Sequence, residues 1–258
     1  FRRVLFRSNP YYPQEPNVGK LTYRLFGNED TMYLSLQNGD LDMTWAYSTG
    51  VSGSYQDVLA ATDTLALEAV TAANAPAVLA FNNANGPFAD ENLRLAVSYA
   101  LDYDSFRTVF GSAYASNPNR GFVPPVTVGY KETEALGQDL TKAAQCMADA
   151  GYTEKNADGF YVNANGEVCV FTLTCNAGKE AHVGYAELVK TQLEQFGIQV
   201  VLETLDADSY NAKTSNKFSE NNVTMEAAIY GFTAAGMGMK NGLASIYVDG
   251  THPVQGGC

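Results

Sequence analysis

The chain has 258 residues, of which 46% are hydrophobic and 17% charged, and its formal net charge at pH 7 is −12. This composition is typical of a globular protein, because it is too apolar for a disordered chain and too mixed for a fibre or a membrane bundle. An acidic surface repels phosphate backbones, so we expect no nucleic-acid partner. No segment approaches the roughly 18 consecutive apolar residues of a membrane-spanning helix. The length admits one large domain or two ordinary ones.

The first eight residues, FRRVLFRS, differ in character from the rest of the chain. They are basic, and they read as the translation of a DNA-sequencing adapter. We therefore interpret residues 1–8 as an assembly artefact and expect them to make no fixed contact with the rest. We also expect the chain to be a fragment that is incomplete at both ends, since Gly256-Gly257-Cys258 matches no recognisable C-terminal ending.

Residues 9–76 are expected to alternate short strands with one helix. Apolar residues alternate with polar ones at 21–25 and again at 41–45, which predicts two strands. Between them, Asp30 is placed to cap a helix that Asn38-Gly39 ends. Residues 48–54, rich in Ser and Gly, are expected to form a loop. The apolar stretch 65–81 is expected to form two extended segments around Asn74-Ala75-Pro76.

Residues 77–232 continue the alternation of helices and strands. After Asp90, a predicted N-cap, apolar residues recur at helical spacing at positions 93, 96, 97, 100 and 101. Asp104 is expected to cap the next helix. Further helices are predicted over 140–150 and 186–196 and from residue 208, with strands at 160–162, 168–174, 198–202 and 226–232. The fold class is therefore mixed, α/β or α+β.

No pattern indicates a metal, a cofactor or a catalytic centre. The four cysteines contain no CxxC pair and no metal-ligand spacing with His182 or His252, so buried free thiols are expected. His182 is expected to form a surface pair with Glu180. Neither histidine lies in a nucleophile–base motif, and the sequence lacks GxSxG and a complete dinucleotide fingerprint. We predict no enzyme activity.

Several motifs follow one another in an informative order. They are NPYY (9–12), LQNGDLD (36–42), PFAD (87–90) with LRLAVSYALD (93–102), PP (124–125), ADAGY (148–152), QLEQFGIQV (192–200) and IYGF (229–232). In this order they resemble the solute-binding proteins of peptide/nickel-type ABC importers, bacterial extracellular solute-binding protein family 5. We interpret Arg94 and Asp102 within these motifs as fold-holding ion pairs or caps.

The resemblance implies a periplasmic-binding-protein-like type II fold with two lobes. Residues 9–76 would form the second part of lobe I, 77–227 lobe II, and 228–258 a hinge strand and the start of the return to lobe I. Such a protein captures a peptide or similar small solute between its lobes and delivers it to ABC permease transmembrane subunits. It would act as a monomer outside the cytoplasmic membrane, in the periplasm or lipid-anchored on the outer face.

The resemblance also places the candidate ligand-binding residues in two segments. They are Trp45, Ser48 and Thr49 in lobe I, and Tyr230, Phe232, Thr233 and Ala234 at the hinge strand. Core packing is the alternative role for Trp45 and also for Tyr230, Phe232 and Thr233, more so for Tyr230 than for the other two, and Ser48-Thr49 could be an ordinary turn.

One position departs from the family pattern. Family members that bind free peptides commonly carry an acidic residue shortly after this strand, where it would pair the ligand's α-ammonium, and Ala235 stands there here. We therefore expect either peptide binding with weak dependence on a free N-terminus or a different solute, with sugars next in line. A glycan-binding or glycan-active module is the alternative function, and the 16 tyrosines are compatible with it.

Overall fold

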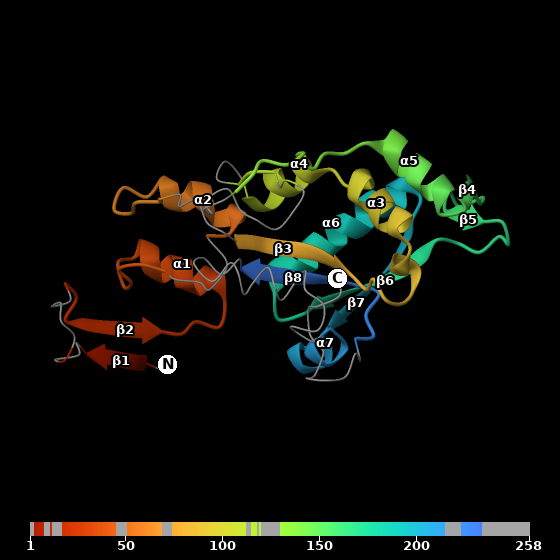
Figure 1. Ribbon diagram of the computed structural model, residues 1–258. Helices are drawn as coiled ribbons and strands as arrows, with labels where there is room; N and C mark the ends of the chain where they lie inside the picture. Colours follow the sequence, from red (N-terminus) through yellow and green to blue (C-terminus); the bar gives the residue numbers. More distant parts are fainter. Residues whose placement is uncertain are drawn as a thin grey trace. The chain divides into compact units, whose positions relative to one another are not determined.

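The structure, a computed structural model, describes residues 3–7, 11, 17–44, 51–68, 74–111, 115–117, 119, 130–214 and 223–233. The chain divides into two compact units, unit 1 (Phe1–Glu68) and unit 2 (Ala69–Cys258) (Figure 1). The predicted lobe boundaries, after residues 76 and 227, fall within or beside two strands that belong to unit 2. The units and the predicted lobes therefore have different limits.

Unit 1 contains a two-stranded sheet and two helices. Strand β1 (Arg3–Arg7) pairs antiparallel with β2 (Lys20–Arg24). Helices α1 (Glu29–Gln37) and α2 (Gly53–Ala60) share a small buried cluster. The expectation that the first eight residues contact nothing is thus wrong for residues 3–7. Their Val-Leu-Phe run has high β propensity, which explains why they can pair with β2.

Three local predictions in unit 1 need correction. Asn28 rather than Asp30 caps α1, since its side-chain oxygen accepts the backbone N–H of Thr31 at 3.0 Å. The strand expected over 41–45 is absent from the described residues 41–44. Helix α2 begins at Gly53, inside the segment expected to be a loop.

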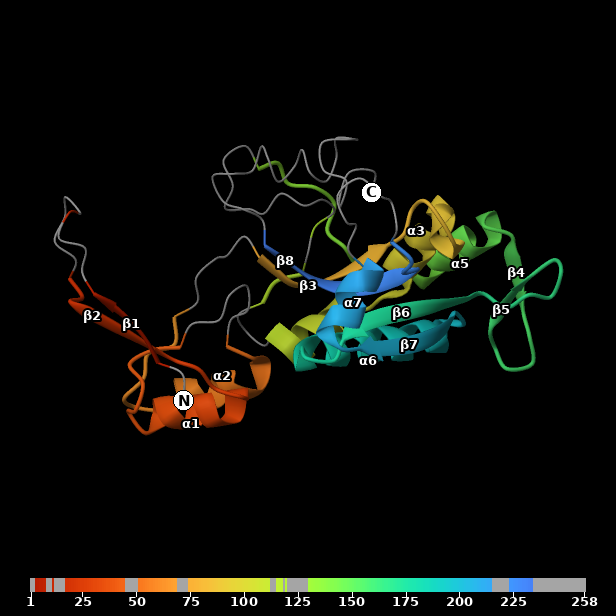
Figure 2. The same ribbon diagram turned by 90° about the horizontal axis from the view of Figure 1, so that it is seen from below.

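Unit 2 is built on a four-stranded sheet with the order β3-β8-β6-β7 (Figures 1 and 2). Its strands are β3 (Asn74–Phe81), β6 (Val170–Asn176), β7 (Gln199–Leu205) and β8 (Ala227–Thr233). β3 runs antiparallel to β8, whereas β8, β6 and β7 are mutually parallel. β6 and β7 pair over all seven residues and are connected by helix α6 (Glu180–Phe196), which forms a βαβ unit. β3 begins at Asn74 and runs through Pro76, so the turn expected there belongs to the second extended segment. Of the first segment, residues 65–68 lie outside any strand, and residues 69–73 lie outside the described residues.

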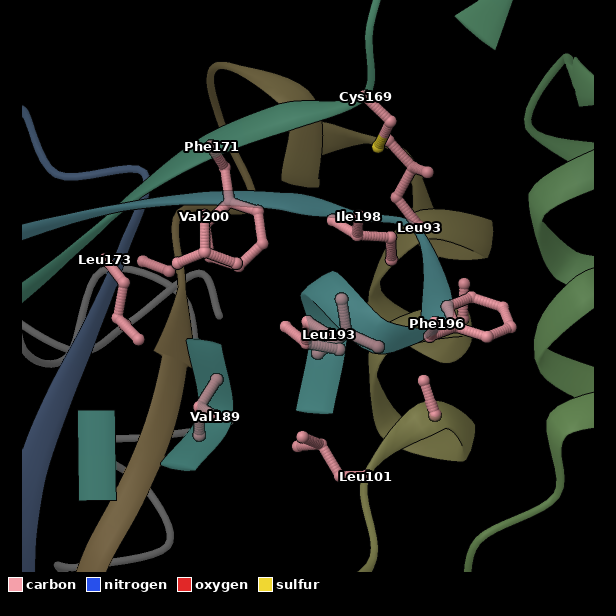
Figure 3. Close-up of a cluster of buried hydrophobic side chains, with 14 of the residues drawn as sticks. Leu93, Leu101, Cys169, Phe171, Leu173, Val189, Leu193, Phe196, Ile198 and Val200 are labelled. Atoms are coloured by element: carbon pink, nitrogen blue, oxygen red, sulfur yellow. The ribbon is translucent and has the colours of Figure 1, made fainter. Parts of the chain in front are cut away.

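Helices cover both faces of this sheet. α6 and α3 (Glu91–Ala100) lie on one face with α5 (Leu140–Asp149) against α3, and α7 (Ala207–Thr214) lies on the other (Figures 1 and 2). The main core lies under α3, α5 and α6 (Figure 3). The remaining elements are η1 (Pro87–Ala89), α4 (Tyr103–Phe106), the π-helix η2 (Arg107–Gly111), β4 (Tyr152–Lys155) and β5 (Tyr161–Asn163).

Two of the predicted helical stripes of unit 2, on α3 and α6, are confirmed. All five apolar positions expected for the helix after Asp90 are buried, and so are residues 186, 189, 193 and 196 of α6. α6 ends at Gly197, whose φ of +115° is the left-handed conformation that favours glycine. His182 is buried on the same stripe of α6, so the surface pair with Glu180 is wrong.

Arg94 and Asp102, the two motif residues interpreted as fold-holding, make local hydrogen bonds that fix the backbone around them. Asp90 caps α3 as predicted, but Asp102 rather than Asp104 caps α4, accepting from the backbone N–H groups of Asp104 and Ser105. Arg94 donates to the carbonyl of Phe88 at 2.6 Å and so fixes η1. The described contacts of Arg94 and Asp102 are therefore structural.

The cysteines in the described part of unit 2 are free thiols, as expected: Cys169 and Cys175 are buried and Cys146 is partly buried. Burial raises the pKa of Cys169 to about 12. Within the described ranges, no His, Cys, Asp and Glu side chains group as metal ligands. Every helix in these ranges is too short or too polar to cross a bilayer.

Candidate functional site

The backbone of β8 offers hydrogen-bonding groups to two sides. Its pairing with β3 extends along the whole strand, with a register shift on β3 between Ala75 and Val78. The Asn82 N–H donates to the carbonyl of Glu226 at 2.9 Å, at the start of this ladder. Because backbone groups alternate along a strand, the even-numbered residues of β8 turn toward β3 and the odd-numbered ones toward β6.

The pairing on the β6 side stops early. Only Leu173–Ala227 and Thr174–Ala228 pair there, and among the described residues no strand continues the ladder beyond Ala228. Gly231, which follows on the same strand, is exposed. We call the β6-facing backbone of residues 229–233 the open edge.

A pair of tyrosines ties α7 to β8 at the beginning of this open edge. The Tyr210 hydroxyl donates to the carbonyl of Ile229 at 2.7 Å, and the Tyr230 hydroxyl donates to the carbonyl of Thr214 at 2.6 Å. The two rings meet edge-on, with centroids 5.9 Å apart. Burial raises the pKa of Tyr210, so its hydroxyl keeps the donated proton at neutral pH. The two bonds run in opposite directions and hold strand and helix together.

An ion pair fixes the other side of α7. Lys213 on α7 contacts the carboxylate of Glu203 on β7, which also accepts from the buried Thr174 hydroxyl at 2.9 Å. The hydrogen bond from Lys213 holds the pKa of Glu203 below its ordinary value. α7 is therefore anchored to β7 and β8 by its own side chains, and to β6 through Glu203.

The predicted site residues fall into three groups in the structure: those outside the described residues, Phe232 and Thr233 in β8, and Tyr230 in the second core. Trp45, Ser48, Thr49 and Ala234 lie outside the described residues, as does Ala235. The backbones of Phe232 and Thr233 lie in β8, opposite Ala75 and Asn74.

The side chain of Tyr230 packs against Tyr210 and Met225 in a small second core on the α7 face of the sheet. This is the core role that was weighed as the alternative to ligand binding for Tyr230. Tyr210 and the exposure of Gly231 were not predicted as site features. A glycine within an otherwise apolar strand is a known sign of close backbone approach, and this signal was available in the IYGF motif.

The geometry of the open edge suits an extended chain. A strand edge with unpaired backbone groups can bind another main chain by adding it as a further strand, and the main-chain bonds formed are independent of ligand sequence. Phe232 and Thr233, the last residues of β8, are still paired with β3.

The sequence model of bacterial extracellular solute-binding proteins, family 5 (middle), matches residues 2–251. The chain belongs to this family. It is 24% identical over 206 residues to the oligopeptide-binding protein AppA of Bacillus subtilis, which covers 77% of this chain and 36% of AppA. It is 26% identical over 157 residues to a probable ABC transporter-binding protein of Deinococcus radiodurans, over 58% of this chain and 25% of that protein. The chain thus spans about a third or less of these relatives.

Solved structures of periplasmic binding proteins share the fold of this family 5 chain. AppA from Bacillus subtilis, in complex with a nonapeptide, superposes with a TM-score of 0.68 at 20% identity, over 90% of this chain and 44% of AppA. DppA from Helicobacter pylori, in complex with the peptide STSA, superposes with a TM-score of 0.74 at 19% identity, over 98% of this chain and 45% of DppA. NikA from Brucella suis, in complex with Fe(III)-EDTA, superposes with a TM-score of 0.75 at 18% identity, over 88% of this chain and 44% of NikA. The predicted mixed α/β, type II periplasmic-binding-protein fold is confirmed.

Proposed function

We propose that this family 5 chain is part of the extracytoplasmic solute-binding component of an ABC importer, and that its ligand is an extended peptide. The open edge of β8 carries this proposal, because an exposed strand edge at Gly231 can pair with the main chain of a peptide of any sequence. AppA and DppA, whose structures contain a nonapeptide and the peptide STSA, support the same ligand class. NikA is described with a metal chelate, so family membership alone leaves the ligand class open.

We further propose that the two predicted segments line the ligand site. Trp45, Ser48 and Thr49 would face the ligand from one lobe, and Phe232, Thr233 and Ala234 from the hinge strand. Tyr230 would contribute by holding β8 in place, since its hydroxyl binds the carbonyl of Thr214. The predicted lobe limits of 9–76, 77–227 and 228–258 remain part of this proposal.

The proposed partners follow from the transporter class. The protein would deliver its solute to permease transmembrane subunits, act as a monomer outside the cytoplasmic membrane, and need no cofactor. We propose no catalytic activity, because the matching family is one of binding proteins. The glycan alternative has no support among the relatives named above.

Two substitutions at one position test the strand-edge proposal in the full-length protein. Gly231→Pro removes the backbone N–H that faces the open edge, whereas Gly231→Ala keeps it. We expect Gly231→Pro to weaken peptide binding about tenfold or more, and Gly231→Ala to change it by about threefold or less, in isothermal titration calorimetry. The melting temperature of both variants shows whether the fold is kept. Equal peptide affinity of the wild type and a folded Gly231→Pro variant would sink the proposal.

The ligand's N-terminus gives a second test. Because Ala235 stands where an acidic partner for an α-ammonium is expected, a peptide and its N-acetylated twin should bind with similar affinity. A preference of tenfold or more for the free amine, about 1.4 kcal/mol, would show that an acidic anchor lies elsewhere.

A further inference from the structure

The carbonyl of Ile229 is the first acceptor on the open edge, and a side chain already occupies it. On the β6 side, the ladder ends at Ala228, and a strand added beyond this point would next need the carbonyl of Ile229. The Tyr210 hydroxyl lies 2.7 Å from that oxygen and donates to it. The next residue whose backbone turns to this side is Gly231, which is exposed.

We propose that Tyr210 ends the ladder available to the ligand, so that an extended peptide pairs with Gly231 but cannot continue to Ile229. This inference rests on the proposed function and names a specificity-determining residue for it. Tyr210 acts by filling the position that a ligand N–H would take. The peptide can then grow along β8 only in the direction of Thr233.

Displacing the Tyr210 side chain would break its packing in the second core, on a helix that further contacts hold in place. Its side chain is only 7% exposed and packs on Tyr230 in the second core of unit 2. Its own carbonyl accepts the hydroxyl of Thr214 at 2.7 Å. The ion pair between Lys213 and Glu203 anchors the same helix. A peptide that swung Tyr210 aside would have to break this packing, whereas growth toward Thr233 costs none of it.

The experiment measures how peptide affinity changes with length. Two series of peptides, one extended residue by residue at the N-terminus and the other at the C-terminus, are titrated by calorimetry into the full-length protein. In the wild type, we expect the series that extends toward Ile229 to gain nothing beyond the residue that pairs with Gly231.

Substitutions at Tyr210 then separate its ring from its hydroxyl. Tyr210→Leu keeps an apolar side chain in the second core but is too short to reach the carbonyl of Ile229. In this variant, we expect the peptide series that extends toward Ile229 to gain about three- to tenfold in affinity for the residue added beyond the one that pairs with Gly231. This gain is the value of one hydrogen bond. Tyr210→Phe removes the same hydroxyl but keeps the ring, which still fills part of the space beside the carbonyl of Ile229, and should give a smaller gain than Tyr210→Leu. Thr214→Val, which loosens α7 without touching Ile229, is the matched control and should leave that series flat.

The outcomes distinguish the two proposals. A wild type that binds no peptide overturns the proposed function. A wild type that gains affinity with length in both series overturns the role of Tyr210, and this result needs no variant. The same follows if a folded Tyr210→Leu variant has the length profile of the wild type, or if Thr214→Val reproduces the gain.

Discussion

In the described part of unit 2, twenty buried side chains from helices and strands form one continuous cluster. The buried cluster in the described part of unit 1 contains only Tyr33, Leu36 and Leu59. Polar bonds between helix N-termini accompany the small cluster of unit 1. The Ser52 hydroxyl donates to Glu29 at 2.8 Å, and the Tyr55 hydroxyl donates to Asp30. These bonds link the first turns of α1 and α2.

The exposed apolar residues of unit 1 show the same contrast. Leu21 and Tyr23 on β2 and Leu25 directly after it are 42%, 40% and 58% exposed within the described structure. Because apolar burial is the dominant favourable term in folding, unit 2 is expected to be the more stable unit by far. Helices and strands are thus held together mainly by core packing in unit 2 and mainly by polar bonds near the surface in unit 1.

Cavity-forming substitutions should show the largest difference between the units. Leu193→Ala empties a fully buried position under α6 and should lower the free energy of unfolding of unit 2 by about 2–5 kcal/mol. Leu59→Ala should cost unit 1 about 1–2 kcal/mol, because the thin cover around its small cluster can collapse into the space. Urea titrations with hydrogen exchange resolved by peptide measure both. Equal losses would contradict the comparison.

Two glycines with positive φ offer a closer test. A Cβ at Gly197 in unit 2 would come within 2.8 Å of the Gly159 carbonyl oxygen and 2.9 Å of Lys155, whereas a Cβ at Gly39 in unit 1 would meet nothing within 4 Å. Both positions share the intrinsic strain of a left-handed alanine, about 1 kcal/mol. We expect Gly39→Ala to cost about that much and Gly197→Ala about 2–3 kcal/mol, measured by thermal unfolding.

If Gly197→Ala cost no more than Gly39→Ala, the contact between the β4–β5 connection and the end of α6 would be too loose to resist a methyl group. The close packing inferred for this part of unit 2 would then be contradicted.

The polar anchor of α7 should have the smallest effect and a defined pH dependence. The folded protein holds the pKa of Glu203 below its ordinary value of 4.5, chiefly through Lys213. Its contribution to stability is therefore present above about pH 4.5 and is lost as the pH falls through the lower, folded pKa. Glu203→Gln should cost about 1 kcal/mol at pH 7 and progressively less below pH 4.5. A difference from the wild type that stays constant down to pH 3 would refute this linkage.

The sequence predicted unit 2 better than unit 1 for a physical reason. The stripe of α6 repeats every three or four residues and ends at Gly197, so local periodicity alone located both the helix and its cap. His182 fits the same stripe four residues before Ala186, and its burial could have been predicted from this spacing. In unit 1, Asn28 and Asp30 are both good cap residues. Asn28 caps α1, whereas Asp30 accepts the hydroxyl of Tyr55 on α2, a tertiary contact that no local pattern encodes.

The candidate site was predictable only in part. The position of β8 and the glycine within it were visible in the IYGF motif. The role of Tyr210 was not, because it depends on α7 approaching β8 from elsewhere in the sequence, which no local pattern encodes. The short α2 was missed because Ser52, Gly53 and Ser54 are typical loop residues, and it was Ser52 that became its N-cap.

The buried thiols of unit 2 provide a natural reporter of its opening. All four cysteines of the chain follow residue 68, and Cys169 and Cys175 are shielded from solvent. A thiol reagent can label these two only when unit 2 opens, and the high pKa of Cys169 suppresses its reaction in the closed state. The only tryptophan, Trp45, belongs to unit 1. Thiol labelling and tryptophan fluorescence therefore monitor the two units separately in one unmodified sample.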